Sequence, residues 1–299
     1  MSYDDIVAAF IEPPATPIAA PVVPDSPARR LRDALEPIAT QGWWSRQAAD
    51  QIQALGLGFF DGYVWGRAAA LGTPEASVVV ATFGVFDANL LAAVYLHGSA
   101  QCSRADVLAA RENGATASLA ALVDNASADA IAAPLLAALD ALDGLGRPLF
   151  SGLRSQPRPS TAQGRLWRAA ELVREHRGDG HLAACAASGL DMATINVLTE
   201  LWLGFAPGEY SATRGLGAEV VAATMTQLEG RGWVAGSQLT SAGREARDDL
   251  EEATDRSQTT LIEALGDQLD DLVGRAETVS AALMSARAFP HDPRKRAAG

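Results

Sequence analysis

The chain has 299 residues, of which 48% are hydrophobic and 20% are charged, and its net charge is −12. This composition is typical of a globular protein and excludes a largely disordered chain. The acidic balance argues against a general affinity for nucleic acid or for anionic membrane, since both need clustered cations, so any contact with DNA has to be local.

The sequence predicts a cytoplasmic protein with no membrane partner. Cys102 and Cys185 are the only cysteines, and their positions show no disulfide or metal-binding pattern. The N-terminus is acidic where a signal peptide would be basic. No apolar run approaches the roughly 20 residues that span a bilayer.

Residues 1–29 are predicted to form a flexible, proline-rich leader. Six of the fifteen prolines fall between Pro13 and Pro27, and proline removes amide donors and favours extended backbone. The first twelve residues are weakly amphipathic, so docking on the body of the protein is the alternative to a frayed tail.

Residues 30–142 show a helical pattern and contain a concentration of aromatic residues. Nine of the eighteen aromatics lie between Trp43 and Tyr95. Such a cluster can line an apolar ligand pocket at a domain junction, or it can form a close-packed core. The residues assigned to the pocket are Trp43, Trp44, Phe59, Tyr63, Trp65, Phe83 and Phe86.

Residues 143–164 collect Gly, Pro, Ser and Arg without periodicity and are predicted to be a linker. After it, the spacing of apolar residues predicts a helix around Met192–Phe205, a turn at Gly215–Gly217 and a second helix over Ala218–Gly230. A hairpin is predicted over Trp233–Thr240, followed by long helices with an apolar leucine stripe. The last residues, 288–299, are predicted to be a basic, solvated tail.

An internal repeat is visible at an offset of 142 residues. Ala76–Phe83 and Ala218–Met225 are identical at five of eight positions, and the match continues without gaps. A unit of this size is one ordinary domain, so the sequence predicts two fused copies. Only residues 165–287 keep a polar helix and a wing, because the matching part of the first copy is almost entirely apolar.

The helix, turn, helix and hairpin, with Leu239-Thr240-Ser-Ala-Gly243-Arg244 at the exit of the hairpin, resemble the winged-helix domain of MarR-type proteins. Most of the chain is also similar to a family of actinobacterial helix-turn-helix proteins of about 300 residues. That similarity is carried by Arg67-Ala-Ala69, Gly146–Phe150 and Arg174–His181. It implies a mainly α fold with a small β-wing.

MarR-type proteins are dimers whose terminal helices form the interface. The resemblance therefore implies a single-chain pseudo-dimer, with a degenerate winged-helix repeat at 30–142 and a winged-helix repeat at 165–287. We expect the segment from Ala115 to Leu142 to pack near the segment from Arg256 to Arg287.

The second copy offers few residues for DNA recognition. Thr226 and Gln227 are able to contact base edges, whereas Glu219 and Glu229 on the same helix disfavour phosphate. Arginines at the ends of the elements suit phosphate contacts but equally suit solvated or paired positions. The candidate DNA-binding residues are Arg214, Thr226, Gln227, Arg231, Arg244 and Arg247.

Asp179 and His181 are weak catalytic candidates. In the structural interpretation, a helix ends near His176, Gly178 makes a left-handed turn and Asp179 caps the next helix. In the functional one, Asp179 orients His181 as an acid–base group, with Cys185 one helical turn away. Two such ligands do not make a metal site, and no nucleotide or nucleophile motif is present, so we predict no metal, no cofactor and no clear enzymatic activity.

The sequence thus favours a MarR-like regulator that contacts DNA through one copy and binds an apolar small molecule between the copies. The alternative is a small-molecule binding protein, or an enzyme, on a winged-helix scaffold that has lost DNA binding. An interaction module that uses the acidic surface is a third possibility.

Overall fold

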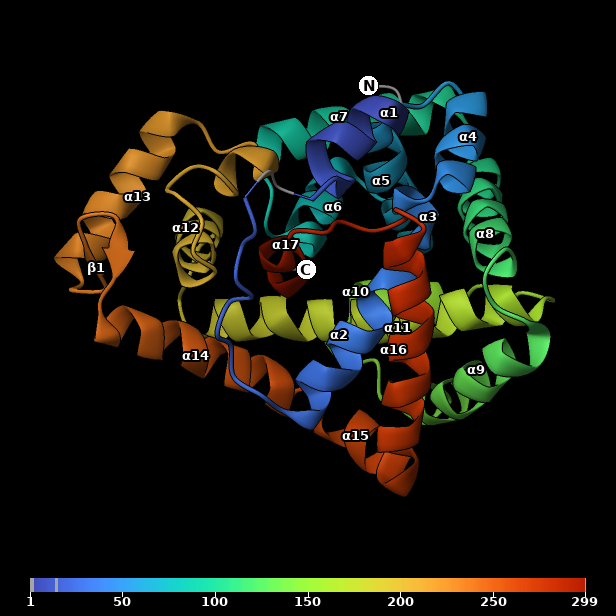
Figure 1. Cartoon of the computed structure of the whole chain (residues 1–299). Coiled ribbons are helices and arrows are strands. Elements are labelled where there is room, and N and C mark those ends of the chain that lie inside the picture. Colours follow the sequence, from blue (N-terminus) through green and yellow to red (C-terminus); the bar gives the residue numbers. More distant parts are fainter. Residues whose placement is uncertain (1–2, 14–15, 299) are drawn as a thin grey trace.

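A computed structural model describes residues 3–13 and 16–298 (Figure 1). The described chain is mainly helical, as predicted. Its only strands in these residues are β1 (Val234–Ala235) and β2 (Gln238–Leu239), which pair antiparallel with Val234 opposite Leu239. Helices α2 to α9 are Pro27–Ala39, Gln41–Trp44, Arg46–Ala54, Phe59–Ala68, Ala76–Phe83, Ala88–Gln101, Arg104–Ala120 and Asn125–Asp140. Helices α10 to α16 are Pro148–Arg154, Ala162–Ala187, Met192–Trp202, Ala218–Gly230, Ser241–Arg256, Thr259–Leu265 and Leu269–Ser285.

Helix α11 is the axis of the molecule. It has 26 residues, which makes it about 39 Å long, and it packs against α2, α8, α9, α10 and α14 (Figure 1). The predicted break near Gly178 is wrong, because the helix continues through it. Gly180 serves close packing instead: a Cβ atom there would lie 2.2 Å from Ser257 Oγ.

The main core is built by a reciprocal exchange of helices. Helix α9 packs on α11, and α16 packs on α2, so that the late helix of each half covers the early helix of the other. Leu135 and Leu139 of α9 and Leu272 of α16 are buried in one continuous cluster. The expected proximity of residues 115–142 and 256–287 is therefore confirmed.

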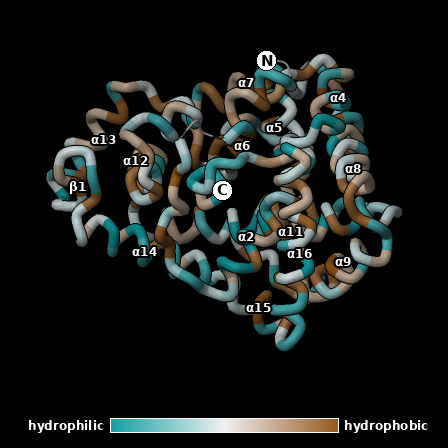
Figure 2. Tube along the Cα trace, in the orientation of Figure 1, coloured by the Kyte–Doolittle hydropathy of each residue, from teal (hydrophilic) through white to brown (hydrophobic). Residues whose placement is uncertain are grey.

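A second core lies within the first half. Val64, Trp65, Val79, Leu91 and Val107 are buried there, and they come from α5, α6, α7 and α8. Figure 2 shows hydrophobic and hydrophilic residues interspersed along most helices, as expected of helices with one buried face. The aromatic-rich segment is thus largely a packed core.

The second half contains the predicted helix-turn-helix unit, which we define as α12 to β2 (residues 192–239). The Asp191 side chain accepts from the Thr194 amide at the start of α12, and Gly215 takes a positive φ of 87° in the turn before α13. Thr240 accepts from the Gly243 amide and caps α14. These boundaries agree with the sequence prediction.

The first half has no matching wing among the described residues. The stretch 91–97, which the repeat aligns with the hairpin, lies inside α7. Leu91 and Tyr95 are buried on the inner face of that helix. A helix with an apolar face replaces the hairpin because nothing in this stretch makes a turn.

The predicted leader, linker and tail pack against the body more than the sequence suggested. The helix α1 (Tyr3–Ile6) and the π-helical turn Val7–Ile11 bury Ile6 and Ile11, so the docking alternative describes this segment. The linker contains α10, whose Leu149 and Phe150 are buried. The tail forms α17 (Pro293–Ala298), which lies at the centre of Figure 1.

No single helix in the described part of the chain is long and apolar enough to span a membrane. Helices α11 and α12 meet those criteria only when taken together, and they are bent by 110° with respect to each other.

Gly114 marks the closest approach between helices α4 and α8, and its substitution tests this packing. A Cβ atom at Gly114 would lie 2.4 Å from Ala48 Cα, which is backbone and cannot rotate away. We predict that Gly114→Ala lowers the free energy of unfolding by about 1–3 kcal/mol, measured by urea denaturation. The matched control is Gly274→Ala on α16, where the added Cβ atom meets open space. This substitution should stabilise the protein by about 0.5–1 kcal/mol, because alanine favours the helix more than glycine does. Equal effects at both positions would contradict the close contact.

Candidate functional site

A polar cavity of about 130 Å³ lies where the helix-turn-helix unit meets α2, α11 and α17. Its walls come from both halves of the chain, including α5, α6, α12 and α14. It is therefore a junction between the two halves and not a pocket within either one. Seven arginines line it: Arg29, Arg32, Arg67, Arg174, Arg177, Arg214 and Arg247.

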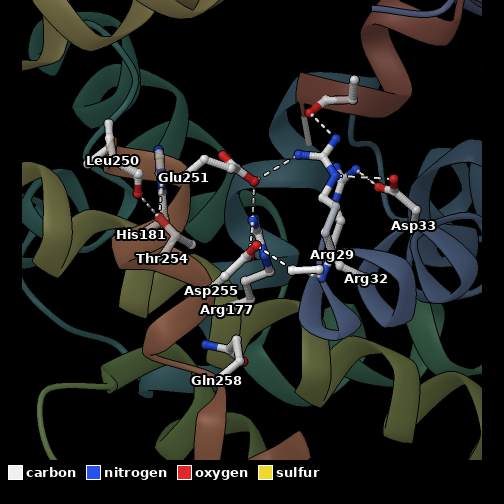
Figure 3. Close-up of polar contacts among 12 residues, drawn as sticks. Arg29, Arg32, Asp33, Arg177, His181, Leu250, Glu251, Thr254, Asp255 and Gln258 are labelled. Atoms are coloured by element: carbon white, nitrogen blue, oxygen red, sulfur yellow. Dashed lines mark hydrogen bonds and ion pairs between the residues drawn. The ribbon is translucent and has the colours of Figure 1, made fainter. Parts of the chain in front are cut away.

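Glu251 of α14 holds three of these arginines together, two of which, Arg29 and Arg177, are drawn in Figure 3. Its carboxylate accepts from Arg29 at 2.8 Å, from Arg247 at 3.0 Å and also from Arg177. The Glu251 side chain is 2% exposed. Burial alone would raise the pKa of Glu251, but Arg177, Arg247 and Arg29 outweigh it and hold that pKa well below its usual value.

Glu175 of α11 performs the same role for two other arginines of the cavity. Both its oxygens accept from Arg67, at 2.9 and 2.7 Å, and Arg174 donates to one of them at 3.1 Å. Arg174 also donates to Glu36 of α2 at 3.2 Å. Burial opposes ionisation of Glu175, yet the two arginines lower its pKa to about 2. Glu175 and its two arginine partners therefore stay charged at neutral pH.

The cavity carries an excess of positive charge inside an acidic protein. Six carboxyl groups line it or pair with its arginines: Asp33, Glu36, Glu175, Asp179, Glu251 and Asp255. Seven guanidinium groups exceed them by one even when all six are ionised. The negative charge is smaller still at neutral pH, because burial raises the pKa of Asp179 to about 7 and this carboxyl group is then only partly ionised.

Several nitrogen atoms of these arginines have no hydrogen-bond partner among the described residues. They are Nε and Nη2 of Arg32, Nε of Arg177 and Nε of Arg214, and all four are buried. An unpaired buried donor costs about 1–3 kcal/mol, and more when it is charged. One acceptor of the lining is in the same state: Glu36 Oε2, 4.0 Å from Arg32 Nε, is buried without a hydrogen bond from any described residue.

The two weak catalytic candidates lie close to the cavity but do not act on each other. Asp179 accepts from the Phe150 amide at 3.0 Å, so it is not the cap of a new helix. His181 Nδ1 lies 3.0 Å from Thr254 Oγ1, and its Nε2 lies 3.6 Å from Cys185 Sγ. Burial and the nearby Arg247 lower the pKa of His181 to about 3, which keeps the ring neutral.

This arrangement contains no acid–base pair between Asp179 and His181. Within the part of the chain that the structure describes, no three His, Cys, Asp or Glu side chains are grouped so as to hold a metal ion.

The predicted aromatic pocket is only partly a pocket. Trp43, Phe59 and Tyr63 border a second cavity, of about 280 Å³, beneath Tyr3 and Ile6 of the N-terminal segment. This second cavity lies within the first half, whereas Tyr63 and Phe83 of the predicted set also line the junction cavity between the two halves. The remaining aromatics pack on each other: Trp44 on Phe59, Phe60 on Phe86, Trp65 on Tyr95 and Phe83 on Tyr63, with ring centroids 5.2 to 6.4 Å apart.

Two of the predicted DNA-contacting arginines are inside the protein. Arg247 is 4% exposed and bound to Glu251, and Arg214 donates to the Tyr210 hydroxyl and stacks on Phe86. Both line the junction cavity, which corresponds to the paired position that the sequence left open for these arginines.

The other four predicted DNA contacts are exposed. Thr226 and Gln227 lie on the outer face of α13, while Arg231 stacks on Trp233 and Arg244 begins α14. Of the six residues predicted to contact DNA, two therefore line the junction cavity and four lie on the surface.

The residues that build the cavity were largely missed by sequence reasoning. Arg29, Arg32 and Glu36 lie on one face of α2, with Arg174 and Arg177 similarly spaced on α11. Charged residues at spacings of three and four within otherwise apolar helices were the available signal. That signal normally describes a solvated helix face, so it does not identify burial by itself.

Among known proteins, one protein family resembles this chain. The model of a helix-turn-helix family matches residues 28–290, which is most of the chain. The chain belongs to this helix-turn-helix family. The match includes both halves and every residue of the junction cavity except those of α17. Neither the curated proteins nor the solved structures contain a match to this helix-turn-helix protein.

Glu251→Gln should destabilise the helix-turn-helix protein strongly, because three buried arginines would lose their shared negative partner. We predict a loss of about 3–5 kcal/mol in the free energy of unfolding, measured by chemical denaturation. The matched control is Asp271→Asn, which removes the exposed partner of Arg275 and should cost less than about 1 kcal/mol. A loss for Glu251→Gln no larger than that of the control would contradict the central role of Glu251.

The neutral His181 should make the protein lose stability in mild acid. The unfolded chain binds a proton at His181 below pH 6.5, whereas the folded protein does so only near pH 3, so stability falls as the pH drops from 6.5. We predict that His181→Gln reduces the loss of unfolding free energy between pH 7 and 5 by about 2 kcal/mol. Denaturation at both pH values measures this, and His97→Gln, at an exposed ring, is the control.

Proposed function

We propose that this protein is a DNA-binding regulator of MarR-like winged-helix type with one DNA-contacting unit. The observation that carries the proposal is the intact helix-turn-helix unit with the outer face of α13 exposed. Gln227, Thr226 and Ala223 lie on that face without being covered by other described elements. Helices presented in this way enter the major groove of DNA in helix-turn-helix proteins.

The unit should contact DNA through few cations. Arg231 at the end of α13 and Arg244 at the start of α14 are exposed beside the hairpin and suit phosphate contacts. Glu219 and Glu229 are also exposed on α13 and repel phosphate. We infer a complex with a shallow salt dependence, in which base contacts by Gln227 contribute much of the selectivity.

We further propose that the chain is a pseudo-dimer made by duplication. The reciprocal packing of α9 on α11 and of α16 on α2 supports this, since a two-fold relation between copies produces such paired contacts. The helices α6 and α13, which carry the repeated sequence, begin at equivalent residues, Ala76 and Ala218, although α6 has 8 residues and α13 has 13. The first copy has exchanged its wing for α7 and contributes scaffold only.

A ligand that binds between the copies can regulate the DNA-contacting unit. Three contacts hold that unit against the first half: Asn196 donates to Val85 O at 2.9 Å, the Asp87 amide donates to Arg214 O at 2.8 Å, and Arg214 stacks on Phe86. Arg214 and Arg247 also line the junction cavity. Occupation of the cavity would thus change the position of α13 relative to the body.

An entirely apolar ligand, as expected from the sequence, does not suit this cavity, because seven arginines contribute to its lining. Membership of a helix-turn-helix family favours DNA binding over the alternative of a scaffold that has lost it. Ligand binding and DNA binding are therefore proposed together.

Selection of bound fragments from sheared genomic DNA, followed by fluorescence anisotropy on the selected duplex, tests the DNA proposal. We predict that Arg231→Glu weakens binding at least tenfold and lowers the salt slope by about one, and that Gln227→Ala costs about 1–3 kcal/mol on the selected sequence only. Arg275→Glu on α16 is the control and should change neither. Failure to enrich any sequence at low salt would overturn the proposal.

A further inference from the structure

The junction cavity has the chemistry of an anion site. We propose that it binds a small dianion, of the size of phosphate or a four-carbon dicarboxylate, through the guanidinium groups of Arg32, Arg177 and Arg214. This inference names the ligand class for the regulation proposed above and rests on it only for its biological effect. Anion binding is measured without DNA, so its failure and the failure of DNA binding are separate results.

The unpaired donors provide the first argument. The four buried nitrogen atoms without a described partner belong to Arg32, Arg177 and Arg214, which line one cavity from three elements: α2, α11 and the turn before α13. Other nitrogen atoms of Arg177 and Arg214 bond Glu251, Asp255 and Tyr210, so these arginines serve the fold and still keep donors without a partner in the described part of the chain. Oxyanions accept such hydrogen bonds with greater strength than neutral groups do.

The charge balance provides the second argument. The arginines around the cavity exceed the carboxylates, so a buried positive charge remains without compensation. Burial of an unpaired charge is costly, and a bound dianion removes that cost. A neutral or cationic ligand would leave the excess unchanged or increase it.

The dimensions limit the ligand. An interior space of about 150 Å³ holds one benzene molecule, so the cavity of about 130 Å³ holds a slightly smaller group. Phosphate and a short dicarboxylate fit this limit, whereas a nucleotide or a nucleic-acid backbone does not. Gly178 on α11 lines the cavity at an exposed position, where a Cβ atom would have only Glu175 Oε2, at 3.9 Å, as a neighbour.

Helix α17 lies over the cavity and occupies two of its arginines. The carbonyl of Ala297 accepts from Arg29 Nη2 at 3.0 Å, and the carbonyl of Arg296 accepts from Arg32. Ala297 and Ala298 form part of the lining. These neutral carbonyls take hydrogen bonds that an anion would otherwise accept, so α17 competes with the ligand.

Isothermal titration of the full chain in phosphate-free, low-chloride buffer tests the proposal. Inorganic phosphate and succinate are the two probes, and succinamide is the uncharged control. We expect one-to-one binding of at least one dianion with a Kd below about 1 mM and none of succinamide. Absence of saturable binding by both dianions overturns the proposal, and the stronger of the two identifies the class.

Two variants locate the bound anion. Arg32→Gln should weaken binding at least tenfold, whereas Arg275→Gln, at an exposed arginine, should leave it unchanged. Gly178→Leu keeps a helix-forming residue in α11 but fills the cavity, and it should abolish binding with the near-ultraviolet circular dichroism retained. Binding that survives Gly178→Leu in a folded protein places the anion elsewhere and overturns the proposal.

Removal of residues 293–299 tests the role of α17. We expect the shortened chain to bind the dianion severalfold more tightly, because Arg29 and Arg32 lose two competing carbonyl acceptors. Weaker binding by the shortened chain contradicts competition by α17.

Discussion

The burial of charged side chains along α11 is the constraint on which the rest of the structure depends. Glu171, Arg174, Glu175 and Arg177 lie on a helix at the centre of the molecule, where each charge requires a partner. The partners come from distant segments: Arg111 for Glu171, Arg67 for Glu175 and Glu251 for Arg177. Packing of the surrounding helices therefore has to bring these segments together, and the junction cavity is the space that their large side chains enclose.

This constraint connects the scaffold with the proposed regulation. The ion pairs join α2, α5 and α14 to α11, while Arg247, bound to Glu251, extends the same network to the helix-turn-helix unit. Arg247 also bonds Thr199 of α12 at 3.2 Å. In the proposed regulation, these short polar contacts would carry the effect of a charge bound in the cavity to the elements that hold α13. Apolar packing alone would transmit it less directionally, since dispersion contacts are weak and numerous.

Local sequence signals were sufficient to predict most of the helices in the second half and the hairpin. The polar caps at Asp191 and Thr240, the glycine at Gly215 and the regular apolar spacing of α12 to α16 each have a local physical cause. The Arg177–Gly180 stretch led to the wrong prediction of a helix break, because glycine and aspartate are common at helix ends. Here tertiary packing against Ser257 and Phe150 requires a small residue and a buried acceptor, so the helix continues.

The sequence by itself determined a mainly α protein with a helix-turn-helix unit, a two-stranded wing, and terminal helices that lie together. It also determined that Thr226 and Gln227 face outward, because the periodicity of α13 fixes which of its residues are exposed. Only the tertiary structure decided that Arg214 and Arg247 face inward and join arginines from residues 29 to 177 around one cavity. An arginine has the same local pattern whether it is solvated or buried against a distant carboxylate. The difference depends on which helices pack together, and that is set by contacts far apart in the sequence.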